Sequence, residues 1–137
     1  MNEYIRVWTN AFNFSERARR KEYWMFILVN SIFSLVIGFL PVANVIYAVC
    51  VIIPSFAVAC RRLHDVNRSG WWLIAPFFTI PLLFTGNSAI TIFASITALL
   101  LSIVLIVFLC LSGTSGSNRF GADPKRRSNI TNKQTLA

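Results

Sequence analysis

Charged residues are scarce in this 137-residue chain, at 13% of its composition, whereas soluble domains carry roughly 25%. Acidic residues are the scarcest, since five Asp and Glu are set against 13 Lys and Arg. Two long runs, residues 23–60 and 69–118, contain no Asp, Glu, Lys or Arg at all. Together with 55% hydrophobic residues, this pattern excludes an ordinary soluble domain and predicts an integral membrane protein.

Potential metal ligands are rare as well. The chain has one histidine, three cysteines and no CxxC motif, whereas zinc sites need four protein ligands, or three and a water. The cysteines, Cys50, Cys60 and Cys110, are odd in number and lie in or beside apolar segments. We therefore expect buried thiols rather than disulfides, and no metal or cofactor.

Each charge-free run is long enough for two membrane-crossing helices, because about 20 apolar residues span the core of a bilayer. We predict an all-α membrane protein with four transmembrane helices. Their approximate ranges are 23–40, 44–60, 71–86 and 90–111. Pro76 and Pro81 interrupt the third span, so a bent or re-entrant element is the alternative there. Residues 1–124 should form one four-span domain, and residues 125–137 a disordered basic cytoplasmic tail.

The basic residues predict the orientation. All 13 Lys and Arg lie in residues 6–21, 61–68 and 119–133, which fall on the same side of the membrane if the chain crosses it four times. The positive-inside rule places both termini and the central loop in the cytoplasm. The aromatic face that includes Tyr4 and Trp8 predicts a short N-terminal helix in the membrane interface. Ser15 is the expected N-cap of a second helix that continues into the first span.

The placement of charge also limits function. Ion pumps and proton-coupled transporters usually carry ionisable residues inside the membrane, and the predicted spans have no Asp, Glu, Lys or Arg. The net charge of +8 does not require a nucleic-acid partner, because basic flanks are expected from topology and from the anionic inner leaflet. We expect no nucleic-acid partner.

The densest polar stretch is RRLHDVNRSGWW, residues 61–72. One interpretation is a cytoplasmic hinge, in which arginines pair with Asp65 at helical spacing, Asn67 or Gly70 turns the chain and Ser69 caps the next helix. The other is an anion site for a lipid headgroup, nucleotide or acidic peptide. Its expected ligands are Arg61, Arg62, His64, Arg68 and Arg119. No catalytic residue is expected, because neighbouring His64 and Asp65 point in different directions on a helix.

Three polar blocks, FSERARRKEYWMF (14–26), RRLHDVNRSGWW (61–72) and GTSGSNRFGADP (113–124), carry a family resemblance. In order and spacing they resemble the signatures of a bacterial inner-membrane family known as domain of unknown function 805. The resemblance implies a four-span protein of the bacterial inner membrane, with all three blocks on the cytoplasmic face. It implies no established activity. The chain departs from the family pattern at Glu16 (usually Gly), Val66-Asn67 (usually Thr-Gly) and Ala122 (often Pro).

The resemblance transfers a structural cluster to this chain, in which Glu22 and Asp65 should each pair with an arginine of another block. Its other members are Arg17, Arg20, Trp24, Gly70, Trp71, Asn118, Gly121 and Pro124. Turn chemistry at Gly121 and Pro124 predicts that the third block folds back on the loop.

The leading functional hypothesis is a non-enzymatic interaction or scaffold module of the inner membrane. Its cytoplasmic cluster would bind anionic lipid of the cytoplasmic leaflet, or a protein partner such as another membrane protein or a second copy. The alternatives are an oligomeric transport or permeation component and, third, a membrane enzyme acting on a lipid or phosphate-bearing substrate.

Overall fold

The computed structural model describes residues 2–124, so the predicted disordered tail at 125–137 lies outside the described residues. The described elements are all helical, as the sequence predicts. They are α1 (Asn2–Thr9), α2 (Arg20–Ile37), α3 (Pro41–Asp65), the 3₁₀ helices η1 (Gly70–Leu73) and η2 (Ala75–Phe84), and α4 (Ser88–Cys110).

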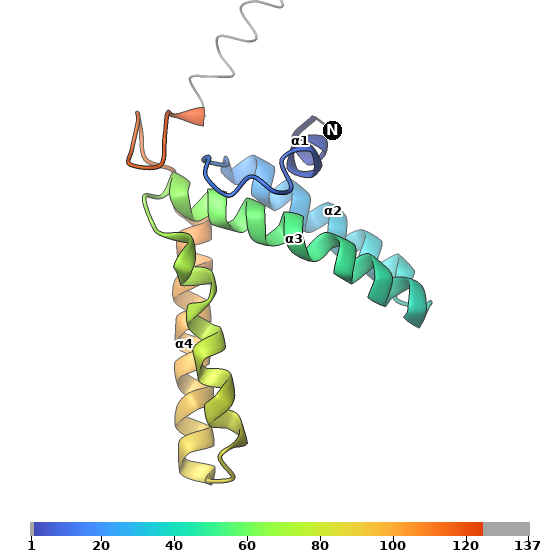
Figure 1. Cartoon of the computed structure of the whole chain (residues 1–137), viewed down its shortest axis with the longest axis vertical. Helices are drawn as coiled ribbons and strands as arrows, with labels where there is room; N and C mark the ends of the chain where they lie inside the picture. Colours follow the sequence, from blue (N-terminus) through green and yellow to red (C-terminus); the bar gives the residue numbers. More distant parts are fainter. Residues whose placement is uncertain (1, 125–137) are drawn as a thin grey trace, which may run out of the picture.

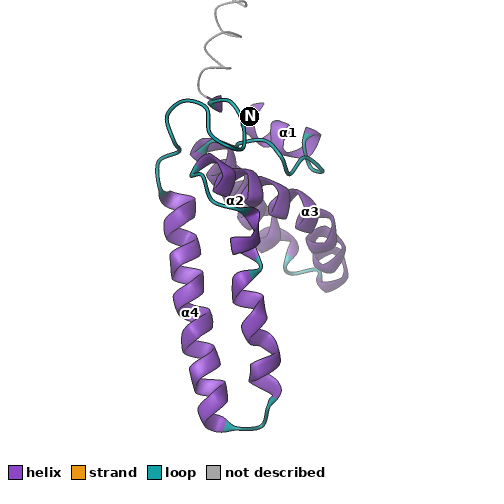
Figure 2. Cartoon of the chain, turned by 60° about the vertical axis from the view of Figure 1, so that its left-hand side comes forward, coloured by secondary structure: helices purple, strands orange, loops and turns teal. Residues whose placement is uncertain are grey.

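The helices form two hairpins that diverge from a shared end (Figures 1 and 2). In one hairpin α2 packs along α3, and in the other η2 packs along α4. The loop after α3, the segment before α2 and the segment after α4 all gather where the hairpins meet (Figure 1). The fold therefore brings all three polar blocks to one end of the molecule and leaves the apolar lengths of the hairpins apart.

Two helices, α3 and α4, are long and apolar enough to cross a membrane. Helix α2 begins with three charged residues, Arg20, Lys21 and Glu22, and the apolar stretch Gly70–Phe84 is shorter than a full span. The four-span topology, the cytoplasmic termini and the interfacial position of α1 therefore stay predictions.

Irregularity in the second hairpin follows from its prolines. Pro76 stands in the first turn of η2 and Pro81 lies inside it, and each removes a backbone N–H donor. The predicted third span is accordingly built from two consecutive 3₁₀ helices rather than one α-helix. In α3, by contrast, Pro54 is accommodated within a continuous helix.

The prediction that Ser15 begins the second helix is wrong. Helix α2 begins at Arg20, and its N-cap is Arg19. The Ser15 N–H donates to Asn13 Oδ1 (3.1 Å) in a local turn. The chain then runs beside α3, where the fully buried Ala18 donates its N–H to the Arg61 carbonyl (3.0 Å). This tertiary contact outweighs the local capping preference of Ser15.

A polar pair fastens the first hairpin. Tyr47 of α3 donates its hydroxyl to Asn30 Oδ1 (2.6 Å), and Asn30 Nδ2 donates to the Phe26 carbonyl (2.7 Å). Hydrogen bonds of this kind between apolar helices contribute roughly 0.6–1.7 kcal/mol in membranes. The bond from Tyr47 to Asn30 also limits the rotation of α2 against α3.

The topology can be tested with single cysteines in a variant lacking Cys50, Cys60 and Cys110. Phe39→Cys and Thr85→Cys lie in the two hairpin turns, so a membrane-impermeant maleimide should label both in intact spheroplasts. Ser117→Cys, an exposed position at the shared end of the hairpins, should react only after permeabilisation. Labelling of Ser117→Cys in intact spheroplasts would contradict a cytoplasmic C-terminal segment.

Candidate functional site

The candidate site is the charged junction, which we define as Arg17, Glu22, Arg61, Arg62 and Asp65 together with the segment 113–121 that covers them. Its side chains come from the segment before α2, the start of α2 and the last turns of α3. All five charged residues are buried. Because several segments contribute to the cluster, the junction fixes the positions of both hairpins and of the C-terminal segment relative to one another.

Asp65 lies at the centre of the charged junction. Its Oδ1 accepts from Arg17, with the carboxylate oxygen 3.1 Å from Nε and 3.0 Å from Nη2. Its Oδ2 lies 2.5 Å from Nη1 of Arg62, one helical turn earlier. The Asp65 carbonyl also accepts from the N–H (2.8 Å) and the hydroxyl (3.1 Å) of Thr114. One residue therefore connects the segment before α2, helix α3 and the chain after α4.

Glu22 and Arg61 form a second buried pair, with Nη1 3.1 Å from Oε1. Burial raises the pKa of Glu22 above its usual range, while Arg61 and Arg6 lower that pKa in part. Within the part of the chain that the structure describes, Arg61 Nη2 is buried and has no hydrogen-bond partner. The pairing of Glu22 and of Asp65 with an arginine from another block, expected from the sequence, is therefore confirmed.

Other guanidinium donors of Arg17 and Arg62 bind backbone carbonyls. Arg17 donates to the carbonyls of Thr114 (2.5 Å) and Gly116 (2.6 Å). Arg62 donates to the carbonyl of Leu109 (3.1 Å) and to that of Leu111. The bond from Arg62 satisfies the Leu109 carbonyl, which lies in the last turn of α4, where carbonyls have no partner within the helix. Arg62 thus caps the C-terminus of α4, and Arg17 anchors the segment after it.

The third polar block folds back on the loop after α3, as the turn residues predict. Asn118 donates from Nδ2 to the His64 carbonyl (2.9 Å), and the Phe120 ring stacks on the His64 imidazole with ring centres 3.9 Å apart. Asn118 and Gly121 close a tight turn through two backbone hydrogen bonds. Gly121 has φ +133, a conformation that other residues rarely adopt.

The hinge interpretation of residues 66–71 matches the geometry. Asn67 has φ +58, so it supplies the left-handed residue that ends α3, a conformation that Asn tolerates better than most residues. Ser69 Oγ accepts from the Trp71 N–H (3.5 Å) at the start of η1. Gly70 has no left-handed φ, but a Cβ there would lie closer than 3.0 Å to Cys60 Sγ. Gly70 is therefore required by close packing rather than by turning.

The five predicted anion ligands do not converge on one open pocket. Arg61 and Arg62, at 1% and 0% exposure, point inward to carboxylates and carbonyls. Arg68 and Arg119 are exposed and lie over the rings of Phe108 (5.0 Å) and Phe120 (4.6 Å). His64 is buried beneath Phe120. Anion binding by this set stays a prediction, and only its two outward members, Arg68 and Arg119, are accessible.

The other members of the predicted cluster lie at the edge of the charged junction. Arg20 is exposed and donates to the Cys110 carbonyl (3.4 Å), and the Pro124 carbonyl accepts from Arg19. Trp24 is 43% exposed and Trp71 is 74% exposed. The two tryptophans therefore face outward from the junction, which suits a position at the membrane interface.

Sequence reasoning missed Gly113 and Thr114 as parts of the site. A Cβ on Gly113 would collide with the Asp65 carboxylate, so this glycine lets the chain pass directly over the ion pairs. Thr114 Oγ1 accepts from Asn118 Nδ2 (2.9 Å) as well as donating to Asp65. The only available signal was their membership of the third polar block, because the contacts are nearly 50 residues distant in sequence.

A metal site is not apparent. Cys60 Sγ lies 3.6 Å from His64 Nε2, but no group of three or more His, Cys, Asp or Glu in residues 2–124 is placed to hold a metal ion. The expectation of no metal and no cofactor stays a prediction.

The chain matches the family model described as "Protein of unknown function (DUF805)" over residues 11–122. It is 42% identical to inner membrane protein YhaH of Escherichia coli strain K12, over 91% of this chain and 98% of that protein. It is also 42% identical to inner membrane protein YhaI of the same organism, over 94% and 100%. Uncharacterized protein YiiR of that strain is 31% identical, over 87% and 89%. No solved structure matches the chain significantly.

Asp65→Asn should destabilise the fold by about 3 kcal/mol, because it leaves the buried Arg17 and Arg62 without a compensating charge. Thermal unfolding in mild detergent, followed by circular dichroism, measures the loss. Glu3→Gln removes a carboxylate from a partly exposed position and should change stability by less than about 0.5 kcal/mol. Equal melting temperatures for the two variants would contradict a central role for Asp65.

Gly113→Ala should loosen the segment after α4, because the new methyl group displaces the chain from the Asp65 carboxylate. Overpacking of this kind costs roughly 1–3 kcal/mol. Faster trypsin cleavage after the exposed Arg119 reports the release of that segment. Ser117→Ala, at an exposed position in the same segment, is the matched control, and a wild-type cleavage rate for Gly113→Ala would count against the close approach.

Proposed function

The chain belongs to the DUF805 family, and we propose that it is a non-enzymatic inner-membrane scaffold whose exposed cations bind anionic lipid headgroups. Two curated relatives that match over nearly their whole length are named inner membrane proteins, which supports the bacterial inner membrane as its location. The family description gives no activity. The proposal therefore rests on how this chain distributes its charges.

The observation that carries the proposal is the separation of the basic residues into two sets. The arginines of the charged junction are buried and engaged with Glu22, Asp65 and backbone carbonyls. A second set is exposed around the same end of the molecule, and we name it the basic rim. It consists of Arg20, Lys21, Arg68 and Arg119.

The buried set supports a structural role rather than a catalytic one. Each of its guanidinium groups is held between at least two elements, and moving it would expose a buried carboxylate or free the end of α4. Such a network favours one fixed arrangement of the two hairpins. A junction whose charged groups are held between several elements suits a scaffold.

The basic rim supports the lipid part of the proposal. Lys and Arg beside membrane helices are attracted to the anionic leaflet by about 1 kcal/mol each, and the planar guanidinium group matches phosphate oxygens in pairs. The two outermost arginines, Arg68 and Arg119, rest on the aromatic faces of Phe108 and Phe120. This stacking limits their motion. Apart from the Arg119 donor on the Asn67 carbonyl (3.2 Å), it leaves N–H groups for a phosphate.

The test is retention of phosphatidylglycerol during purification in mild detergent. The double variant Arg68→Gln/Arg119→Gln should retain about tenfold less of this lipid than the wild type, because two headgroup contacts are lost. Native mass spectrometry counts the bound lipid directly. Retention by the wild type should also fall with added salt, since exposed charge pairs are screened.

Arg68→Lys/Arg119→Lys is the matched control, because it keeps both charges and loses only the planar fork. It should retain most of the lipid, and all three proteins should melt within a few degrees of one another. Unchanged phosphatidylglycerol retention by the Gln double variant, or a salt-insensitive signal, would overturn the lipid proposal.

A further inference from the structure

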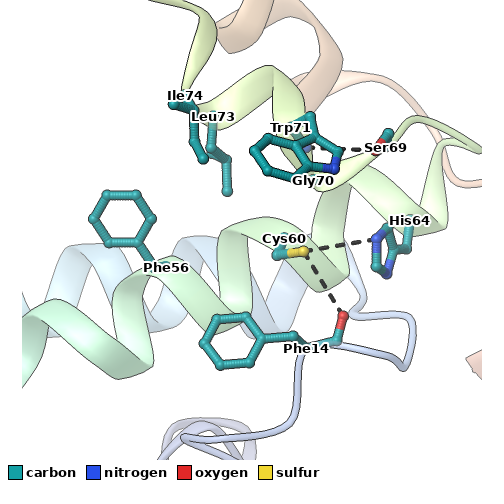
Figure 3. Close-up of a pocket in the computed structure, with 9 residues that line it drawn as sticks. All are labelled: Phe14, Phe56, Cys60, His64, Ser69, Gly70, Trp71, Leu73 and Ile74. Carbon is teal, nitrogen blue, oxygen red and sulfur yellow. Dashed lines mark hydrogen bonds between the residues drawn. The ribbon is translucent and has the colours of Figure 1, made fainter. Parts of the chain in front are cut away.

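A separate pocket of about 380 Å³ lies beside the charged junction, in the angle between α3 and η1. The segment before α2 closes it through Phe14, and Cys60 and His64 of α3 form its floor (Figure 3). Its volume is within the range of small-molecule sites in proteins. The pocket uses none of the exposed cations of the basic rim.

Among the described residues that line this pocket none is charged, although buried ion pairs lie on the other faces of the same helix. Its polar side-chain groups are the hydroxyl of Ser69, the imidazole of His64, the thiol of Cys60 and the indole N–H of Trp71. The Cys60 thiol donates to the Phe14 carbonyl (3.7 Å) and lies 3.6 Å from His64 Nε2. These groups can form hydrogen bonds with an uncharged molecule, and with His64 in its neutral form none of them carries a positive charge to offset a phosphate or carboxylate.

The pocket has a polar end and an apolar end. Figure 3 shows His64 and Ser69 together at one side, whereas Phe56, Leu73 and Ile74 lie at the other. The ring of Trp71 stands above the floor between them. The polar end adjoins the hinge after α3, and the apolar end continues along α3 toward its apolar length. This gradient matches an amphipathic molecule that enters from the membrane.

Gly70 is the residue that creates this shape. A Cβ at position 70 would lie closer than 3.0 Å to Cys60 Sγ and 3.8 Å from His64 Nε2. Because Gly70 has no Cβ, η1 approaches α3 closely at the polar end of the pocket. The two elements separate toward Phe56 and Ile74 (Figure 3). The small size of Gly70 therefore contributes to the shape of the pocket.

We propose that this pocket binds one uncharged membrane lipid, with its hydroxyl or carbonyl head at His64 and Ser69 and its apolar chain between Phe56 and Ile74. Anionic phospholipids are poor occupants, because their phosphate would lie without a cation among the lining residues. This site is independent of the basic rim, so either proposal can fail without the other.

The probe is a long-chain alcohol that carries a photoreactive diazirine on its chain, compared with the carboxylic acid of the same length. After irradiation in phosphatidylcholine nanodiscs, the alcohol should label residues between 56 and 74, and the acid should label them about fivefold less. Peptide mass spectrometry locates the adducts. Equal labelling of this region by both probes would overturn the preference for an uncharged head.

Ile74→Trp fills the apolar end of the pocket and should lower alcohol labelling about fivefold. Ile80→Trp is the matched control, because Ile80 has similar exposure (43% against 39%) and lies outside the pocket on the same apolar stretch. Equal labelling in the two variants would place the alcohol in bulk lipid and overturn the site.

A second measurement needs no change in the pocket itself. In a Cys50→Ala/Cys110→Ala protein, Cys60 is the remaining thiol, and the unmodified alcohol should slow its alkylation by N-ethylmaleimide several-fold. The matched acid should protect it less. An alkylation rate that the alcohol leaves unchanged would also overturn the proposal, even if Ile74→Trp fails to fold.

Discussion

The fold depends on Asp65 accepting an arginine on each carboxylate oxygen. Arg62 reaches Oδ2 from the same helix, while Arg17 reaches Oδ1 from a segment 48 residues earlier in the chain. Both arginines then hold carbonyls at or beyond the end of α4. A buried ion pair gains little over an apolar contact of the same shape, because its desolvation cost offsets most of the attraction. Here the ion pairs fix the positions of the segments that carry them, because one misplaced partner would leave a buried charge without compensation.

That constraint explains why the hairpins can diverge and still form one defined structure. Few apolar contacts join α3 to α4, and the two hairpins separate beyond the charged junction (Figure 1). In a lipid environment, apolar side chains gain little by packing on another helix instead of on lipid. Polar contacts that must be satisfied therefore determine the relative position of the hairpins. Within residues 2–124, the atoms of the junction that are buried without a hydrogen-bond partner are Arg61 Nη2 and Glu22 Oε1. Glu22 Oε1 still lies 3.1 Å from Arg61 Nη1.

The sequence predicts the helices and the charge pairs far better than it predicts their local geometry. Charge-free runs identify the apolar helices because lipid tolerates little else. The pairing of Glu22 and Asp65 could be anticipated because the family resemblance places the three polar blocks, which hold few carboxylates among many arginines, on one face. The start of α2 could not, because the contact of Ala18 with Arg61 is tertiary and outweighs the capping signal of Ser15. Gly113 was hidden for a similar reason, since its close approach to Asp65 joins segments that only the fold brings together. The inward direction of Arg61 and Arg62 also depends on which face of α3 packs against α2, which helical spacing alone leaves open.

The last turns of α3, residues 60–65, therefore border two chemically different sites. On α3, Arg61, Arg62 and Asp65 turn toward the charged junction, while Cys60 and His64, four residues apart and so on one face, turn toward the uncharged pocket. His64 connects the two, because its carbonyl accepts from Asn118 and its ring is covered by Phe120. A ligand that displaces His64 would disturb Phe120, and with it Arg119, which lies over the Phe120 ring and donates to the Asn67 carbonyl (3.2 Å). The pocket and the basic rim are therefore joined by direct contacts through His64 and Phe120, although no cation of the basic rim lines the pocket.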